Sequence, residues 1–475
     1  MTILSLVPGA GLLAAGRRRV GAVLLTLTAV ALAGLAAFVL TGDAAGRALR
    51  LAVRPRDLLV IAVLVGAVAL FWCLTIVATA LAAKPVRPSG FQTALAAVLV
   101  VALCVAVIAP SSVGVRYALI QRDLVTSLFA DGGPAPLPGA ATPDVEKKDP
   151  WASTPRVNLL LLGSDAGADR TGIRTDSMMV ASIDTKTGDT LLFGIPRSLQ
   201  NAPFPEKDPL HKVWPNGFNC GSECLLNAVW SQAEAHRDLF PGDPRPGLTA
   251  IRDVIGEILG LPIDYYTIID LKGFQSLVDA MGGVTVNVPR NIPIGGGKID
   301  GTNRERPITG TIPKGRHHLN GYEALWFSRS RTGADDYDRM KRQRCMVSAL
   351  LDQTNPVQLL QKYPKLASVA KHNISTDVRQ QDLEAWVDLV ERIQNGTIRS
   401  LPLTNQVIST VHPDFEAIHA LVQDALHSSP AAAPTSTATA TTPSTTRTSS
   451  PNSGGGTRGD EKPDLTKPQD FAAVC

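Results

Sequence analysis

Arginine and aspartate gather in two segments of this chain that lie far apart in the sequence. One is SRSRTGADDYDRMKRQR (328–344), which contains Arg329, Arg331, Arg339, Arg342 and Arg344 beside Asp335, Asp336 and Asp338. The other is GSDAGADRTGIRTDS (163–177), which contains Asp165, Arg174 and Asp176. The planar guanidinium grips phosphate oxygens through paired hydrogen bonds, each contributing about 1.5–3 kcal/mol. The two segments therefore predict a site for a metal-bridged phosphate.

Crowded arginines repel one another unless acids or a polyanionic ligand neutralise them. Ion pairing at the surface explains Lys341 and Arg344, which we expect to be solvated. It explains Arg197 poorly, because Ile195-Pro196-Arg197 ends an apolar strand and places this side chain at the end of the strand. A helical spacing of i, i+3, i+4 and i+7 puts four side chains on one face: Arg339, Arg342, Gln343 and Met346. Of these, Arg342 fits either interpretation.

Asp165 follows the first predicted strand, and Asp176 lies in the loop before the second. Open α/β sheets bind ligands at such strand ends. Two carboxylates there can share a hard ion such as Mg²⁺, with Mn²⁺ as an alternative, and the ion bridges to phosphate. The alternative is that the two acids cap a turn and a strand entry. Their neighbours Arg174 and Arg197 favour the metal and phosphate site. Either acid could also act as the base.

Strands alternate with helices after residue 156, which predicts a three-layer α/β/α domain with a central mixed sheet. The continuous apolar run Val157–Leu162 is typical of a strand buried on both faces. Further predicted strands are Met178–Ile183, Leu191–Ile195 after a turn at Thr187–Asp189, Tyr265–Asp270 and Val284–Val288. Predicted helices are Ser222–His236, Leu248–Leu259 and Lys272–Met281, the last capped by Gly282 and Gly283.

Three apolar runs precede this domain, each long enough to cross a bilayer as a helix: Val20–Leu40, Leu58–Ala83 and Phe91–Ala109, the last ended by Pro110. Arg17, Arg18 and Arg19 favour a cytoplasmic start, so three crossings put the rest of the chain outside. The loop that carries Arg47, Arg50, Arg54 and Arg56 disagrees, because this topology places it outside. We expect a multi-pass protein of the cell membrane with its α/β domain outside the cytoplasm.

The predicted boundaries are 1–110 for the membrane region, 111–155 for a linker, 156–427 for the α/β domain and 428–475 for a tail. The tail is rich in Ser, Thr and Pro and predicts disorder. The net charge of +4 gives no support for a nucleic-acid partner.

Cysteines and histidines outside these clusters have plainer interpretations. Cys220 and Cys224 could form a zinc half-site or a short disulfide, and an oxidising exterior favours the disulfide. Cys345 and Cys475 have no obvious partner, and we expect His317 and His318 to be loop residues. No GxSxG, P-loop or HExxH pattern occurs.

Four segments in order resemble the LytR-CpsA-Psr family: VNLLLLGSDAGADRTGIRTDSMMVASID, LLFGIPRS, YYTIIDLKGFQSLVDAMGGVTVNVP and GYEALWFSRSRTGADDYDRMKRQR. The resemblance covers about residues 156–426. It implies a phosphotransferase that moves a glycopolymer from a polyprenyl-diphosphate carrier onto a peptidoglycan acceptor. For an actinobacterial host it implies arabinogalactan or a comparable wall polysaccharide as cargo. A pyrophosphatase acting on the same carrier and a non-catalytic binder of lipid-linked polymer are the alternatives.

The resemblance also assigns residues. It implies Asp165 and Asp176 as the Mg²⁺ ligands, and it places six side chains around the diphosphate: Arg174, Arg197, Arg329, Arg331, Arg339 and Gln343. Five residues would be catalytic: Arg174, Asp176, Arg197, Arg329 and Arg331. The chain departs from the family pattern after the IPR motif, where Ser198 replaces an acid. Asn201 and Ala202 occupy a region where another arginine is common, so Lys207 or Lys212 could substitute.

Overall fold

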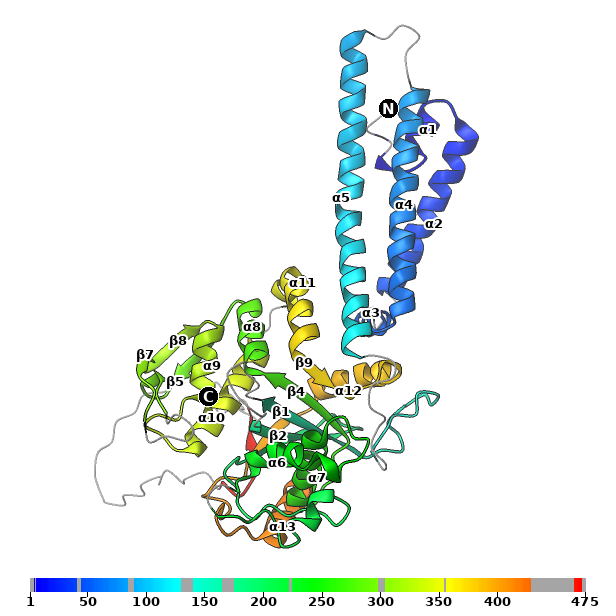
Figure 1. The fold of residues 1–475 in the computed structure, drawn as a ribbon. Helices are drawn as coiled ribbons and strands as arrows, with labels where there is room; N and C mark the ends of the chain where they lie inside the picture. Colours follow the sequence, from blue (N-terminus) through cyan, green and yellow to red (C-terminus); the bar gives the residue numbers. More distant parts are fainter. Residues whose placement is uncertain are drawn as a thin grey trace, which may run out of the picture.

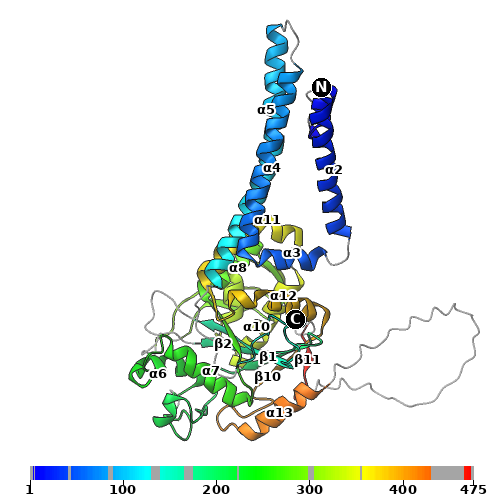
Figure 2. The same cartoon turned by 90° about the vertical axis from the view of Figure 1, so that its right-hand side faces the viewer.

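The computed structural model describes residues 4, 6–40, 44–83, 89–129, 140–164, 175–221, 224–297, 304–353, 356–428 and 465–471. It shows a stalk of long helices standing on one side of an α/β domain (Figures 1 and 2). Residues 165–174, which carry the predicted Asp165 and Arg174, lie outside the described residues.

A mixed seven-stranded sheet forms the middle of the α/β domain. Its strands lie in the order β11 (Gln469–Asp470), β10 (Ile398–Pro402), β3 (Thr190–Ile195), β2 (Thr175–Asp184), β1 (Arg156–Ser164), β4 (Tyr265–Asp270) and β9 (Ile374–Thr376). Strand β1 pairs parallel to β4 and antiparallel to β2. The expected mixed sheet is confirmed.

Helices cover both faces of this sheet, as the continuous apolar run in β1 predicts. Leu160 and Leu162 of β1 join one apolar core, while Leu159 and Leu161 pack against another. The first core includes α6 (Val229–Ala235), α7 (Pro246–Leu259) and α13 (Phe415–His427). The second includes α8 (Leu271–Met281), α9 (Gly321–Arg329), α10 (Asp336–Asp352) and α12 (Leu383–Asn395). Side chains that alternate along each strand therefore build two cores, which gives three layers.

Two small antiparallel sheets flank the second core. Strand β5 (Val284–Val288) pairs with β8 (Gly315–Leu319), and β6 (Ile292–Gly295) pairs with β7 (Ile308–Ile312). The expectation that His317 and His318 are loop residues is wrong, because both belong to β8. His317 lies opposite Val286, and His318 lies opposite Thr285. Their neighbouring positions in a strand point them to opposite faces, so they do not share a site.

One edge of the large sheet collects five strand ends that matter for function. Strands β1, β3, β4 and β10 run in the same direction, because β10 is parallel to β3 and β2 is antiparallel to both β1 and β3. They end at Ser164, Ile195, Asp270 and Pro402, beside the start of β2 at Thr175. The two predicted clusters and the IPR motif therefore reach the same edge.

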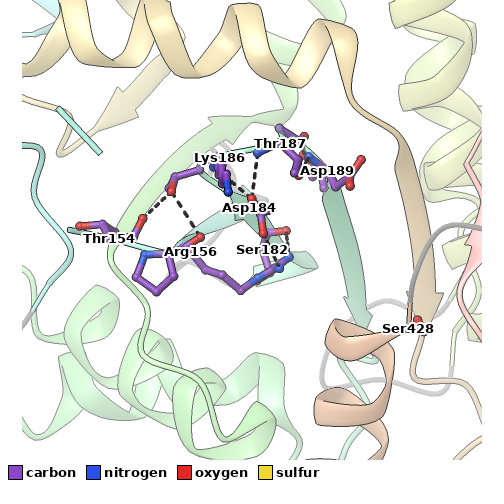
Figure 3. A network of polar contacts seen from close by, with 12 residues as sticks. Thr154, Arg156, Ser182, Asp184, Lys186, Thr187, Asp189 and Ser428 are labelled. Carbon is purple, nitrogen blue, oxygen red and sulfur yellow. Dashed lines mark hydrogen bonds and ion pairs between the residues drawn. The ribbon is translucent and has the colours of Figure 1, made fainter. Parts of the chain in front are cut away.

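The opposite edge is held by backbone and polar contacts around the β2–β3 turn, the predicted turn at Thr187–Asp189 (Figure 3). Asp184 Oδ1 accepts from the amides of Lys186 and Thr187 at 3.0 and 2.9 Å. Arg156 Nε donates to Ser182 Oγ at 3.0 Å. These contacts fix the turn and leave the functional edge unobstructed.

The amino-terminal region is helical throughout its described part. Its helices are α1 (Ala10–Ala14), α2 (Arg18–Leu40), α3 (Ala44–Ala52), α4 (Pro55–Ala82) and α5 (Gly90–Leu128). Among the described residues, α4 and α5 are long and apolar enough to cross a membrane. Pro110 does not end the third apolar run as expected but lies inside α5. Proline has no amide hydrogen to donate to the carbonyl four residues earlier, yet α5 continues through it. The next residue, Ser111, donates from Oγ to the carbonyl oxygen of Val107 at 2.8 Å.

The stalk is docked onto the α/β domain through two separate contacts. On α5, Tyr117 stacks on Tyr363 of α11 (Pro356–Asn373) with ring centroids 6.0 Å apart, and Asp123 pairs with Lys371 at 2.7 Å. Around the short helix α3, acids of α12 neutralise two arginines. Arg50 Nε lies 3.2 Å from Asp388 Oδ1, and Arg54 Nε lies 2.5 Å from Glu384 Oε1. This pairing gives a physical reason for the arginine-rich loop that the charge pattern left unexplained.

The expected linker 111–155 differs from the structure over much of its length. Residues 111–128 continue α5, and residues 140–155 pack on the domain. Trp151 is 1% exposed, and its Nε1 donates to the carbonyl oxygen of Ala385 at 2.8 Å. The amide of Ala141 donates to Asp264 Oδ1 at 2.8 Å. Buried aromatic surface and backbone hydrogen bonds therefore hold most of this segment in place.

A short part of the tail and one cysteine differ from expectation. Most of the predicted disordered tail lies outside the described residues, but β11 pairs with β10, and Phe471 is buried in the second core. Cys220 and Cys224 form the expected disulfide, with Cα atoms 5.2 Å apart. Cys345 is also disulfide-bonded, contrary to expectation, while Cys475 lies outside the described residues.

Reversing two charges on α12 tests the docking of the stalk. In the full chain, Glu384→Arg with Asp388→Arg should speed amide exchange in α3 and α12 about three- to tenfold, because exposed ion pairs each contribute about 0.2–1 kcal/mol. Adding Arg50→Glu and Arg54→Glu should restore the slow exchange, as measured by mass spectrometry. Glu391→Arg on the same helix is the control. Equal exchange in all four proteins would contradict the docking contact.

Candidate functional site

Two aspartates and two arginines form a chain of ion pairs at the functional edge of the sheet. Arg197 Nη1 lies 2.5 Å from Asp176 Oδ1, and its Nε lies 3.3 Å from Asp336 Oδ1. The same Asp336 oxygen lies 2.8 Å from Arg339 Nη2, which also donates to the carbonyl oxygen of Asp176 at 3.2 Å. The four side chains are named here the clamp. It joins residues that are 163 positions apart in the sequence.

Each member of the clamp is placed by an ordinary structural element. Asp176 is the second residue of β2, and Arg197 follows β3 after Pro196. Helix α10 begins because Asp335 caps it, with Oδ1 accepting from the amide of Asp338 at 2.8 Å. That cap puts Asp336 in the first helical position and Arg339 one turn later, on the side facing β2 and β3.

Burial and the neighbouring charges set the protonation of the clamp. Burial opposes ionisation of Asp176, but the guanidinium groups of Arg197 and Arg339 outweigh it and lower the pKa of this carboxyl. Burial similarly opposes the charge of Arg197, yet Asp176 and Asp336 raise the pKa of its guanidinium. Burial lowers the pKa of Arg339, against the attraction of Asp336. Asp176 and Arg197 are therefore held in their charged forms at neutral pH.

Two buried polar atoms of the clamp have no hydrogen-bond partner within the described part of the chain. They are Arg339 Nε and Asp336 Oδ2. An unsatisfied buried polar atom costs about 1–3 kcal/mol, so such atoms need a structural or functional reason. A ligand oxygen could accept from Arg339 Nε, and a cation could be held by Asp336 Oδ2. The two carboxylates of the clamp thus balance the charge of its two guanidinium groups, but two of its buried polar atoms have no hydrogen-bond partner among the described residues.

An apolar cavity of about 260 Å³ opens beside the clamp, between the sheet and helices α8, α9 and α10. Its charged lining residues are Asp176 and Arg339 of the clamp together with Asp270 and Arg329, and Gln343 adds an amide. Its walls are apolar side chains, among them Leu161, Met179, Ile269, Phe274, Leu325 and Met346. Charged residues beside apolar walls suit an amphiphilic ligand, with its polar group at the clamp and its apolar part in the cavity.

The structure treats the other predicted site residues in different ways. Arg329 ends α9 at the cavity, with its guanidinium carbon 5.1 Å from the ring centre of Trp326. Gln343 lines the cavity, and its Oε1 accepts from Ser177 Oγ at 3.4 Å. Arg331 is exposed in the α9–α10 connection, and no described contact brings it to the clamp. Asp165 and Arg174 lie outside the described residues.

Two arginines of the second cluster are structural residues. Arg342, which the spacing left undecided, is 2% exposed; it pairs with Asp338 at 2.9 Å and donates to the carbonyl oxygens of Phe327 and Ser330. It therefore joins α9 to α10. The expectation that Arg344 is solvated is wrong, because it is 8% exposed and burial lowers its pKa to about 10. Lys341 is exposed, as expected.

The structure adds two residues that the sequence reasoning did not assign to the site. Asp336 was grouped with its neighbours as a neutralising acid, although its spacing from Arg339 was a usable signal. Asn227 lies in a short 3-10 helix, Leu226–Ala228, before α6, within the range predicted as the helix Ser222–His236, and no pattern in the sequence pointed to it. Its amide donates to Asp176 Oδ1 at 3.4 Å, and its backbone amide donates to the carbonyl oxygen of Arg197. Lys207, the suggested substitute cation, instead pairs with Asp253 of α7.

Removing one cation from the clamp should destabilise the fold in a pH-dependent way. Arg339→Met leaves two carboxylates under-neutralised, which should cost about 3–5 kcal/mol at neutral pH. The lowered pKa of Asp176 stabilises the fold above the ordinary carboxyl pKa of 3.8, and this contribution is lost as the pH falls. The deficit of the variant should therefore be constant near neutral pH and shrink as the pH falls below 3.8 in denaturant titrations. Lys341→Met is the matched control, and a deficit independent of pH would refute the electrostatic account.

Comparison with known proteins identifies the family of this chain. The LytR_cpsA_psr family matches residues 139–424, more than half of the chain. Biofilm regulatory protein A of Streptococcus mutans is 29% identical over 239 residues, covering 49% of this chain and 52% of that protein. The polyisoprenyl-teichoic acid–peptidoglycan teichoic acid transferase TagV of Bacillus subtilis is 27% identical over 233 residues, with coverages of 49% and 52%. The chain thus spans about half the length of these two relatives.

A solved structure gives a similar but partial match. The crystal structure of Bacillus subtilis TagV superimposes with a TM-score of 0.38 at 23% identity, covering 58% of this chain and 98% of that chain. The match to the family extends across the clamp, the apolar cavity and every strand of the large sheet except β11. The chain therefore belongs to the LytR-CpsA-Psr family.

Proposed function

We propose that this protein is a phosphotransferase that moves a glycopolymer from a polyprenyl-diphosphate carrier onto peptidoglycan through a phosphodiester bond. The observation that carries the proposal is the clamp at the mouth of an apolar cavity. A polyprenyl diphosphate has the same two parts, an anionic diphosphate and a long apolar chain. Relatives named as transferases of polyisoprenyl-linked teichoic acid to peptidoglycan support the substrate class.

In this reaction a sugar hydroxyl of the acceptor attacks the phosphorus next to the carried polymer. A new P–O bond forms to the acceptor, the P–O bond to the carrier breaks, and polyprenyl phosphate leaves. Phosphoryl transfer depends mainly on positioning and on neutralising charge. Arg197 and Arg339 serve both needs, and the orphaned Nε of Arg339 offers a donor to a phosphate oxygen. The hydroxyl proton passes to a carboxylate, for which Asp176 and Asp165 are the two candidates.

The donor set at the clamp fits a magnesium ion. Mg²⁺ is commonly bound by one or two carboxylates plus substrate phosphates, and it keeps several waters. Asp176 would hold it together with Asp165, the partner that the family resemblance implies. Asp336 Oδ2 is a further oxygen near this position, since Asp336 and Asp176 bind the same guanidinium. When bound, the ion would neutralise charge on the diphosphate.

The proposed location is the outer face of the cell membrane. Helices α4 and α5 are long and apolar enough to cross a membrane. A third crossing by the apolar helix α2 would place the α/β domain outside, given a cytoplasmic start at the arginines before it. Such an anchor would keep the cavity near the lipid carrier. An arabinogalactan or related wall polysaccharide stays the finer prediction for the cargo.

Loss of the clamp's central arginine should abolish transfer. Arg197→Ala should lower kcat for transfer from lipid-linked polymer to peptidoglycan fragments by about 10²–10³-fold, because the arginine stabilises developing phosphate charge. The phosphodiester product is measured by mass spectrometry, and Lys341→Ala on α10 is the control. Transfer at the parent's rate would remove Arg197 from the mechanism. Release of phosphate-containing lipid without any acceptor would favour a pyrophosphatase, and retention without product would favour a binder.

Metal binding should depend on Asp176. Titration with Mn²⁺, followed by electron paramagnetic resonance, should show that Asp176→Asn weakens binding by about 10–100-fold because a carboxylate ligand is lost. Asp338→Asn is the matched control, since its carboxylate pairs with Arg290 and Arg342 rather than with the clamp. Equal affinity in the two variants would exclude Asp176 as a ligand.

A further inference from the structure

A polar groove lies at the functional edge beyond the clamp. It has a volume of about 530 Å³, within the usual range of ligand sites, and it is formed by the segment 405–411 and Tyr337 of α10. Its polar lining consists of amide, hydroxyl and phenol groups from Tyr337, Asn405, Gln406, Ser409 and Thr410. Among the described residues, no lysine, arginine, aspartate or glutamate lines it. The groove is therefore polar but uncharged.

The groove is held in a fixed position relative to Arg197. Tyr337 Oη and Thr410 Oγ1 are 3.1 Å apart, and the amide of Gln200 donates to the carbonyl oxygen of Thr410 at 2.9 Å. Asn201, at a positive φ of 52°, donates from its side chain to the carbonyl oxygen of Val411 at 3.0 Å. The segment 409–411 is thus tied to the residues that follow Arg197.

The clamp separates this groove from the apolar cavity. The cavity lies over β4, β1 and β2, whereas the segment 405–411 follows β10, on the far side of β3 in the sheet. Arg197 leaves β3 between them. Tyr337 of the groove is also the next residue after Asp336, which binds both clamp arginines. A ligand phosphate bound at the clamp would lie between the apolar cavity and the uncharged polar groove.

In-line phosphoryl transfer assigns these two sides different roles. The attacking and leaving oxygens lie roughly in line across the phosphorus. If the leaving polyprenyl phosphate extends into the apolar cavity, the attacking hydroxyl arrives from the side of the groove. Amides and hydroxyls can both donate hydrogen bonds to sugar hydroxyls and accept hydrogen bonds from them. An uncharged lining would not neutralise the negative charges of a polyphosphate chain, so it favours a sugar over such a chain.

We propose that the groove binds the glycan strand of the acceptor and positions its attacking hydroxyl. This inference rests on the proposed function, and it names the acceptor's binding site. Asn405 and Gln406, both exposed, are its recognition residues, and Tyr337 is the positioning residue that holds Thr410.

Kinetics of the full chain in detergent test the groove. Asn405→Ala with Gln406→Ala should raise the KM for the peptidoglycan acceptor about tenfold, while kcat and the KM for the lipid-linked donor stay within about twofold. Gln423→Ala, an exposed amide on α13, should change neither KM. Tyr337→Phe should raise the acceptor KM to a smaller extent. An unchanged acceptor KM would overturn the inference, as would a rise in the donor KM alone, which would place the carried polymer in the groove.

Direct binding separates failure of the groove from failure of the proposed function. Isothermal titration of the full chain with an undecorated glycan fragment of peptidoglycan should show binding that the double alanine variant weakens about tenfold. This result would support the groove even if no phosphodiester product formed. Absence of binding by the parent, or equal binding by the variant, would overturn the groove while leaving the transferase proposal to its own assay.

Discussion

Mutual neutralisation of Asp176, Arg197, Asp336 and Arg339 is the interaction on which the functional edge depends. Two guanidinium groups could not remain buried side by side without these carboxylates, because desolvation would favour their neutral forms or a different fold. The neutralisation is also incomplete in hydrogen bonds, since Arg339 Nε and Asp336 Oδ2 have no partner among the described residues. A site that is balanced in charge yet unsatisfied in hydrogen bonding is suited to an anion that arrives with a cation.

The clamp divides its surroundings by polarity. On one side the sheet and helices α8, α9 and α10 enclose apolar walls, and on the other the segment after β10 presents amides and hydroxyls. This division follows from the strand order, because β4, β1 and β2 form the floor of the cavity while β10 lies beyond β3. Apolar, charged and uncharged polar surfaces therefore follow one another along one sheet edge, in the order cavity, clamp and groove.

The stalk of apolar helices is joined to the α/β domain by side-chain contacts as well as by the chain itself. Continuation of α5 through Pro110 leaves little free chain between the apolar helix and the domain, and α11 and α12 hold the stalk from two directions. Exposed ion pairs are individually weak, so the docking depends on their combination with the stacked rings of Tyr117 and Tyr363.

The sequence alone determined the α/β class and the central strands, because a strand that is buried on both faces consists of a continuous run of apolar residues. It also determined the arginine and aspartate segments, because each is a cluster of charged residues that are close together in the sequence. It could not separate Arg339 from Arg342, which share a helical spacing but turn to different partners, nor recognise that Arg344 is buried. Asn227 and Asp336 became site residues only through tertiary contacts, because hydrogen bonds between distant segments leave no periodic pattern. The short strands β8 and β11 escaped prediction for the same reason, since partners elsewhere in the chain stabilise them. Composition and periodicity specify which surfaces are buried, whereas the packing of distant segments decides which charged groups meet.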